Sequence, residues 1–118
     1  MLKLLSAGRA LASGQGKLSS RKNAMTVDVE EYFTVQNLDG VVSRDAWPAQ
    51  PLRSDTQTRR LLDLFDHHGV KATFFVLGWV GERLPELVKE IHARGHEVAA
   101  HSYWHRLVFD MTPEQFRE

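Results

Sequence analysis

The 118-residue sequence predicts an α/β fold in which parallel strands alternate with crossover helices. Short stretches rich in apolar and β-branched residues alternate with amphipathic, helix-like stretches, as in βαβ units. Gly69 and Gly95, each placed where it can end a helix, are closely followed by the next strand-like stretch. Residues 72–77 are apolar on both faces, which is typical of a strand buried in a parallel sheet.

Three strands are expected. The first, residues 25–30, is dominated by β-branched residues and alternates in polarity. Residues 72–77 form the second strand, and residues 96–100 form a short third one. Residues 34–55 contain one glycine and two prolines and show no sustained periodicity, so they are predicted to be a long loop of the kind that often serves function.

Capping residues indicate where the helices begin and end. The first helix is expected to follow an N-cap at Ser54 or Asp55 and to end at Gly69. The second begins near Leu84, with a proline tolerated in its first turn. A third begins at residues 112–115, where Thr, Pro, Glu and Gln provide an N-cap, a first-turn proline and a capping-box glutamine.

The chain is expected to comprise a basic leader and one partial domain. Residues 1–22 contain five Lys or Arg and no acid, and their apolar stretch is too short for a secretory signal. We therefore expect a disordered leader, and a cytoplasmic rather than a secreted protein. Residues 23–118 hold only about three strands, which would leave sheet edges uncovered, so we expect a truncated first part of a larger α/β domain.

Composition excludes several classes of protein. Residues 23–118 contain ten Lys or Arg against fifteen Asp or Glu, a balance that does not favour nucleic-acid binding. The absence of cysteine excludes disulfide scaffolds, thiolate metal sites and cysteine nucleophiles. No run approaches the about 18 apolar residues of a transmembrane helix. The sequence leaves the oligomeric state open.

The first polar cluster lies at the end of the first predicted strand. Asp28 and Glu30 are two residues apart, so their carboxylates project from the same face of the strand. This is the carboxyl end of a parallel strand, where α/β proteins place their sites. An acid pair at a strand end can also be merely solvated, and the pair alone leaves both interpretations open.

The second polar cluster follows the third predicted strand. His101 and His105 are four residues apart, a spacing that puts two imidazoles on one side of a helical turn and within reach of one cation. The same spacing also occurs in histidines that are simply exposed. The other four histidines fall at or near helix ends and are expected to be structural or surface residues.

Together the two clusters predict a metal-dependent hydrolase. The carboxyl ends of parallel strands share one edge, where Glu30, His101 and His105 would offer one oxygen and two nitrogens to a divalent cation. Asp28, on the same face and free of the cation, would accept a proton from water. A site of this kind hydrolyses a carbonyl derivative.

Three ordered motifs resemble those of a known family. They are residues 26–33 (TVDVEEYF), 69–78 (GVKATFFVLG) and 95–105 (GHEVAAHSYWH). Over residues 23–118 the chain resembles the polysaccharide deacetylases, that is, carbohydrate esterase family four with its NodB-homology domain. The variant resembles the branch found beside bacterial exopolysaccharide and exosortase loci.

The resemblance implies a distorted (β/α)7 barrel that holds one divalent metal ion, zinc first, with cobalt or manganese as alternatives. It implies removal of N- or O-acetyl groups from a bacterial polysaccharide. By position, Asp28 corresponds to the catalytic base, and His101 and His105 to metal ligands. Many members place a second, metal-binding aspartate directly after the base; Val29 stands there, and Glu30 is assigned as the third ligand instead.

Aromatic residues near these motifs are candidates for binding a polysaccharide or oligosaccharide. Trp104, inside the histidine motif, and Tyr32 could stack on sugar rings, as could Trp47 and Trp79. The family's base-orienting arginine and general-acid histidine belong to motifs expected beyond Glu118. Two other interpretations stay open: an amidohydrolase-like relative acting on a small cyclic amide, and a non-catalytic remnant that binds only carbohydrate or metal.

Overall fold

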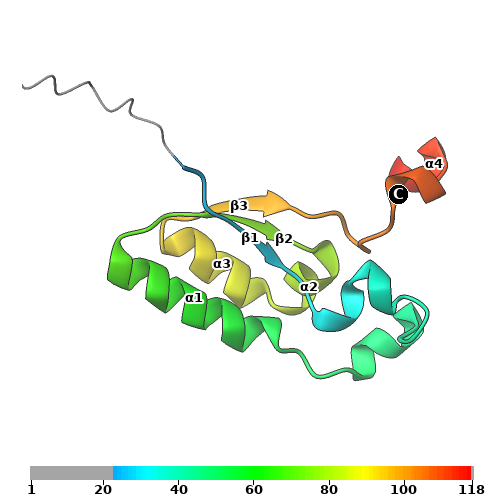
Figure 1. Cartoon of the computed structure of the whole chain (residues 1–118), viewed down its shortest axis with the longest axis horizontal. Coiled ribbons are helices and arrows are strands. Elements are labelled where there is room, and N and C mark those ends of the chain that lie inside the picture. Colours follow the sequence, from blue (N-terminus) through cyan, green and yellow to red (C-terminus); the bar gives the residue numbers. More distant parts are fainter. Residues whose placement is uncertain (1–22, 118) are drawn as a thin grey trace, which may run out of the picture.

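The structure is a computed structural model in which residues 23–117 are described (Figure 1). The leader predicted for residues 1–22 lies outside the described residues. Three strands, β1 (Thr26–Val29), β2 (Thr73–Val76) and β3 (Glu97–Ala100), form one parallel sheet in the order β1-β2-β3. Their register aligns Asp28 with Phe75 and Phe75 with Ala99. The predicted α/β class with parallel strands is confirmed.

Within residues 23–117, four α-helices and four 3₁₀ helices connect and follow the strands. The α-helices are α1 (Ser54–His68), α2 (Gly78–Arg83), α3 (Pro85–Ala93) and α4 (Pro113–Arg117). The 3₁₀ helices are η1 (Tyr32–Thr34), η2 (Gln36–Leu38), η3 (Arg44–Ala49) and η4 (Val108–Asp110). None of the helices within residues 23–117 has the length and apolar character that a membrane-spanning helix needs.

The hydrophobic core lies between one face of the sheet and the helices α1 and α3 (Figure 1). Alternation along the strands turns Val29, Phe74 and Val76 towards these helices. Each helix packs one stripe of buried residues against them: Leu62 and Phe65 of α1, and Leu87 and Ile91 of α3. On the opposite face of the sheet Asp28 and Glu97 are exposed, so polar side chains on that face are available for chemistry.

Two predicted helix signals are confirmed by the backbone. Gly69 ends α1 with φ +63°, a left-handed conformation that glycine adopts without strain. At α4 the Thr112 N–H donates to Gln115 Oε1 (2.9 Å) and the Gln115 N–H donates to Thr112 Oγ1 (3.3 Å), which is the predicted capping box.

Three expectations about the helices need correction. The second predicted helix is preceded by an additional short helix, α2, whose two glycines and short length conceal it in the sequence. Residues 34–55 are not a featureless loop, because they contain 3₁₀ turns that bury Trp47. Neither Ser54 nor Asp55 is the N-cap of α1. Arg53 occupies that position, and its side chain makes no capping hydrogen bond.

Candidate metal centre

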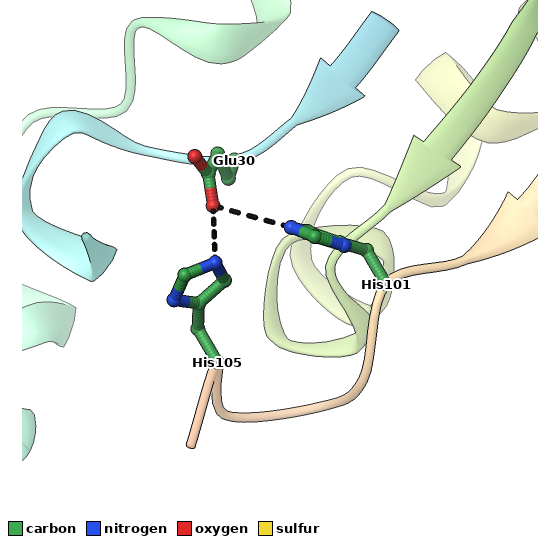
Figure 2. A group of neighbouring side chains, drawn as sticks. All are labelled: Glu30, His101 and His105. Carbon is green, nitrogen blue, oxygen red and sulfur yellow. Dashed lines mark ion pairs between the residues drawn. The ribbon is translucent and has the colours of Figure 1, made fainter. Parts of the chain in front are cut away.

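Glu30 is the first residue after β1, and its side chain turns to the open face of the sheet. The preceding carbonyl, that of Val29, accepts a hydrogen bond from the Leu77 N–H (3.1 Å). This bond extends the β1–β2 ladder by one step, so the chain reaches Glu30 from a fixed strand end. Figure 2 shows the Glu30 carboxylate directed towards the two histidines that follow β3.

The histidine motif continues directly from β3. The His101 N–H donates to the Val76 carbonyl (3.0 Å), which fixes its backbone at the end of the sheet. The predicted helical turn is wrong: Ser102 and His105 have φ of +54° and +53°, and residues 101–105 form an irregular loop. The two left-handed residues reverse the chain tightly enough to bring the imidazole centroids to 5.0 Å.

The start of α2 holds this loop in place. Gly78 N–H donates to the Ser102 carbonyl (2.8 Å), and Trp79 N–H donates to the Tyr103 carbonyl (3.2 Å). A β-carbon on Gly78 would lie 2.6 Å from Tyr103 Cδ2 and 3.1 Å from Tyr103 Cα, so glycine is required for this approach. The Tyr103 hydroxyl donates a hydrogen bond to Glu82 Oε2 (2.5 Å). This bond raises the pKa of Tyr103.

Three ligand atoms converge at the edge of the sheet. Glu30 Oε2 lies 3.6 Å from His101 Nε2 and 3.3 Å from His105 Nε2, and all three atoms lie within 4.8 Å of one another (Figure 2). In a tetrahedral zinc site with ligand bonds near 2.0–2.1 Å, neighbouring ligand atoms are about 3.3 Å apart. The donor set and the two distances from Glu30 Oε2 to the imidazole nitrogens therefore fit a divalent cation.

Two buried polar atoms of the cluster lack hydrogen-bond partners among the described residues, which also favours a bound cation. Glu30 Oε2 is buried, and among the described residues it has no hydrogen-bond partner. A buried carboxylate oxygen without a partner is unfavourable, and a bound cation would remove this penalty. His105 Nδ1 is likewise buried without a partner within residues 23–117.

Comparison with protein families identifies the chain. The family model described as "Polysaccharide deacetylase" matches residues 44–118, which is more than half of the chain and includes both histidines of the site. The chain belongs to the polysaccharide deacetylase family. The predicted family is thus confirmed, while Asp28 and Glu30 lie before the matched residues.

Curated relatives support this assignment over shorter segments. A peptidoglycan-N-acetylglucosamine deacetylase of Bacillus cereus (strain ATCC 14579) is 38% identical over 60 residues, which are 51% of this chain and 22% of the relative. A chitooligosaccharide deacetylase of Bradyrhizobium sp. (strain ANU 289) is 46% identical over 48 residues, 41% of this chain and 22% of the relative. The chain thus spans about a fifth of these two curated deacetylases.

Solved structures of the family share the fold. A Mycobacterium smegmatis protein assigned to the polysaccharide deacetylases matches with a TM-score of 0.60 at 28% identity. The peptidoglycan N-acetylglucosamine deacetylase Bc1960, solved with a naphthyl N-hydroxybenzamide, matches with a TM-score of 0.55 at 28% identity. Each match covers 80% of this chain and 34% of the solved chain. The fold prediction of a deacetylase-like α/β arrangement is confirmed, and the chain corresponds to about a third of each solved structure.

Asp28, the predicted base, is exposed on the open face of the sheet. It belongs to β1 two residues before Glu30, so strand geometry points both carboxylates to that face. It is not one of the three residues whose ligand atoms converge. Its role as a base stays a prediction.

The aromatic candidates for sugar binding fall into two groups. Trp104 and Tyr32 are 40% and 42% exposed, so both rings have surface available for a sugar. Trp47 and Trp79 are each only 1% exposed and pack with Phe33, which excludes them from sugar stacking. Trp47 instead supports the site, because its ring packs 5.9 Å from that of Trp104.

The remaining histidines play no direct part in the cluster. His67, His68 and His92 are exposed in the last turns of α1 and α3, as expected for surface residues. His96 is buried between Phe65 and Phe74, and its Nδ1 accepts a hydrogen bond from the Ala72 N–H (3.1 Å). Burial, assisted by the positive charge of Lys71, lowers the pKa of His96.

Glu31 is a residue of the site region that sequence reasoning overlooked. It follows Glu30 directly but is only 1% exposed. Its hydrogen-bond donors belong to Arg53 and Ser54, more than 20 residues further along the chain. No local pattern indicates such a partner; the only signal was an acid adjoining a predicted ligand.

Proposed function

We propose that this chain carries the metal centre of a deacetylase that removes N-acetyl groups from a polymer containing N-acetylglucosamine. The observation that carries the proposal is the convergence of Glu30, His101 and His105 in a member of this family. The names of its relatives support the substrate class, since they act on peptidoglycan N-acetylglucosamine or on chitooligosaccharides.

The metal we propose is zinc, with cobalt or manganese as alternatives. Two imidazole nitrogens and one carboxylate oxygen are the ligand set of several catalytic zinc sites, which keep a further position open for water or substrate. The compound bound to Bc1960 is an N-hydroxy amide, a group that chelates metal ions through two oxygens. This supports a metal-dependent reaction in a relative with the same fold.

In the proposed reaction, water hydrolyses the acetamide of the sugar to acetate and a free amine. A bound divalent cation would supply Lewis acidity and lower the pKa of a water molecule to about 7. Glu30, His101 and His105 would hold that cation, and Asp28 would accept the proton that water loses as it attacks. Trp104 and Tyr32 offer exposed aromatic faces on which a sugar ring can stack.

A calorimetric titration of the full chain with Zn²⁺ tests the metal centre. We expect one equivalent of zinc to bind, and His101→Ala to weaken its binding by more than the about 10- to 100-fold loss typical of residues that only support a ligand. His92→Ala is the matched control, because His92 is exposed at the end of α3. If the wild-type chain binds none of zinc, cobalt or manganese, the proposal is wrong.

Acetate release tests the substrate class separately. Oligomers of N-acetylglucosamine and an O-acetylated polysaccharide are incubated with the metal-loaded protein that carries this chain, and acetate is measured for each. We expect release from the N-acetylglucosamine oligomers and its inhibition by an N-hydroxybenzamide. Release from the O-acetylated polymer alone would overturn the proposed substrate. The exopolysaccharide branch remains a prediction.

A further inference from the structure

We infer that Glu31 is a positioning residue of the metal centre, which it stabilises by fixing the backbone of Glu30 to the first turn of α1. The inference rests on the proposed metal site. It starts from the alternation of an extended chain, in which consecutive side chains point to opposite sides. Glu30 accordingly faces the two histidines, whereas Glu31 faces the protein interior and is 1% exposed.

Burial of a carboxylate is unfavourable unless hydrogen bonds replace its contacts with water, and the start of α1 supplies these hydrogen bonds to Glu31. Glu31 Oε1 accepts hydrogen bonds from the Ser54 N–H (2.9 Å), the Ser54 hydroxyl (2.5 Å) and the Arg53 N–H (3.0 Å). Glu31 Oε2 also lies 3.0 Å from the same Arg53 nitrogen. The positive end of the 15-residue α1 dipole adds a favourable field for the negative charge.

The main chain of Glu31 is fixed as well. Its carbonyl accepts hydrogen bonds from the Thr34 N–H (3.0 Å) and the Thr34 hydroxyl (2.7 Å), which close the turn of η1. Side chain and carbonyl of this one residue are therefore anchored to two different elements. Such a residue can move only if α1 and η1 move with it.

Glu30 depends on this anchor because it lies outside the strand ladder. The last paired residue of β1 is Val29, whose carbonyl is bonded to the Leu77 N–H. On the other side of Glu30, the first fixed point is Glu31. A ligand atom must be held within roughly 0.5 Å of its productive position, and residues behind a ligand supply that restraint. Two fixed neighbours, Val29 and Glu31, supply it to Glu30.

The test compares Glu31→Gln with Ile91→Val in the full chain. Glutamine keeps the shape of Glu31 but removes its negative charge and replaces one acceptor oxygen by a donor. Ile91→Val removes one methylene from the buried face of α3 and serves as a mildly destabilising control. Zinc affinity is measured at a temperature at which circular dichroism shows each variant folded, and Co²⁺ spectra report the ligand geometry.

We expect Glu31→Gln to weaken zinc binding by about 10- to 100-fold and to change the Co²⁺ spectrum, as is typical for residues behind a metal ligand. Ile91→Val should change neither. If Glu31→Gln does not fold, Ser54→Ala removes a single donor to the same carboxylate and should still weaken binding several-fold. Unchanged affinity and spectrum in a folded variant would overturn the inference, whereas absence of metal binding in the wild type would overturn the proposed function instead.

Discussion

Glu30 and Glu31 are consecutive glutamates with opposite environments. Glu30 is half-buried and contributes a buried oxygen to the candidate cation site, while Glu31 is enclosed and binds the start of α1. Alternation along β1 was enough to predict the direction of Asp28 and Glu30. The partners of Glu31 could not be predicted, because they depend on how α1 packs against the end of β1.

Substitution of Asp28 can distinguish a role in catalysis from a role in metal binding. We predict that Asp28→Asn changes zinc affinity by less than about 3-fold, because Asp28 lies outside the converging ligand set. The same substitution should lower the rate of acetate release by about 10²–10⁴-fold, which is the usual contribution of a general base. Calorimetry and acetate release measure the two effects. A large loss of zinc affinity would show that Asp28 is a ligand rather than the base.

At the scale of elements, the site is assembled where three parallel strands and the short helix α2 meet. The sequence was sufficient to predict the strands and the edge they share, because strand alternation and glycine helix ends are local signals. It was not sufficient to predict the conformation of residues 101–105. A histidine spacing of four is typical of a helix, but here backbone hydrogen bonds from Gly78 and Trp79 impose an irregular loop.

Gly78 connects α2 to this loop, and its substitution should damage the metal centre. We predict that Gly78→Ala destabilises the fold by about 1–3 kcal/mol, as overpacking does, and weakens zinc binding. The new β-carbon would collide with the Tyr103 ring at Cδ2 (2.6 Å) and would lie tightly against Tyr103 Cα (3.1 Å). Gly81→Ala is the matched control in the same helix, since its β-carbon would meet nothing closer than Val76 Cγ1 at 3.4 Å. Thermal unfolding and zinc titration of both variants check the prediction; equal behaviour would contradict it.

At the scale of the whole molecule, charged residues connect the helices at the edge away from the metal centre. The Arg94 guanidinium contacts Asp63 (2.7 Å) and Asp66 (3.0 Å) of α1 and Glu90 (2.5 Å) of α3. Burial opposes ionisation of Asp66, but hydrogen bonds from Arg94 and Lys71 outweigh it and hold the pKa of Asp66 below its ordinary value. Its contribution to stability is therefore lost only under strongly acidic conditions, below pH 4.

His96 makes the stability of the whole unit depend on pH in a different range. It lies beneath the sheet between Phe65 and Phe74, so burial, followed by the charge of Lys71, lowers its pKa from the ordinary 6.5. Its Nδ1 accepts the Ala72 N–H, a bond that protonation would break. Below about pH 6.5 the unfolded chain therefore binds a proton that the folded chain does not, and stability must decrease as the pH falls.

We predict that the free energy of unfolding is constant above pH 7.5 and declines below pH 6.5 by up to about 1.4 kcal/mol per pH unit, the limit for one proton taken up on unfolding. Urea unfolding from pH 8 to pH 5.5 measures it, with a chelator present so that metal release from the histidine motif does not contribute. His96→Gln should flatten this dependence, and exposed His92→Gln should preserve it. If the two variants have the same pH dependence, His96 does not cause the decline, and an NMR titration of its imidazole would then show no lowering of its pKa.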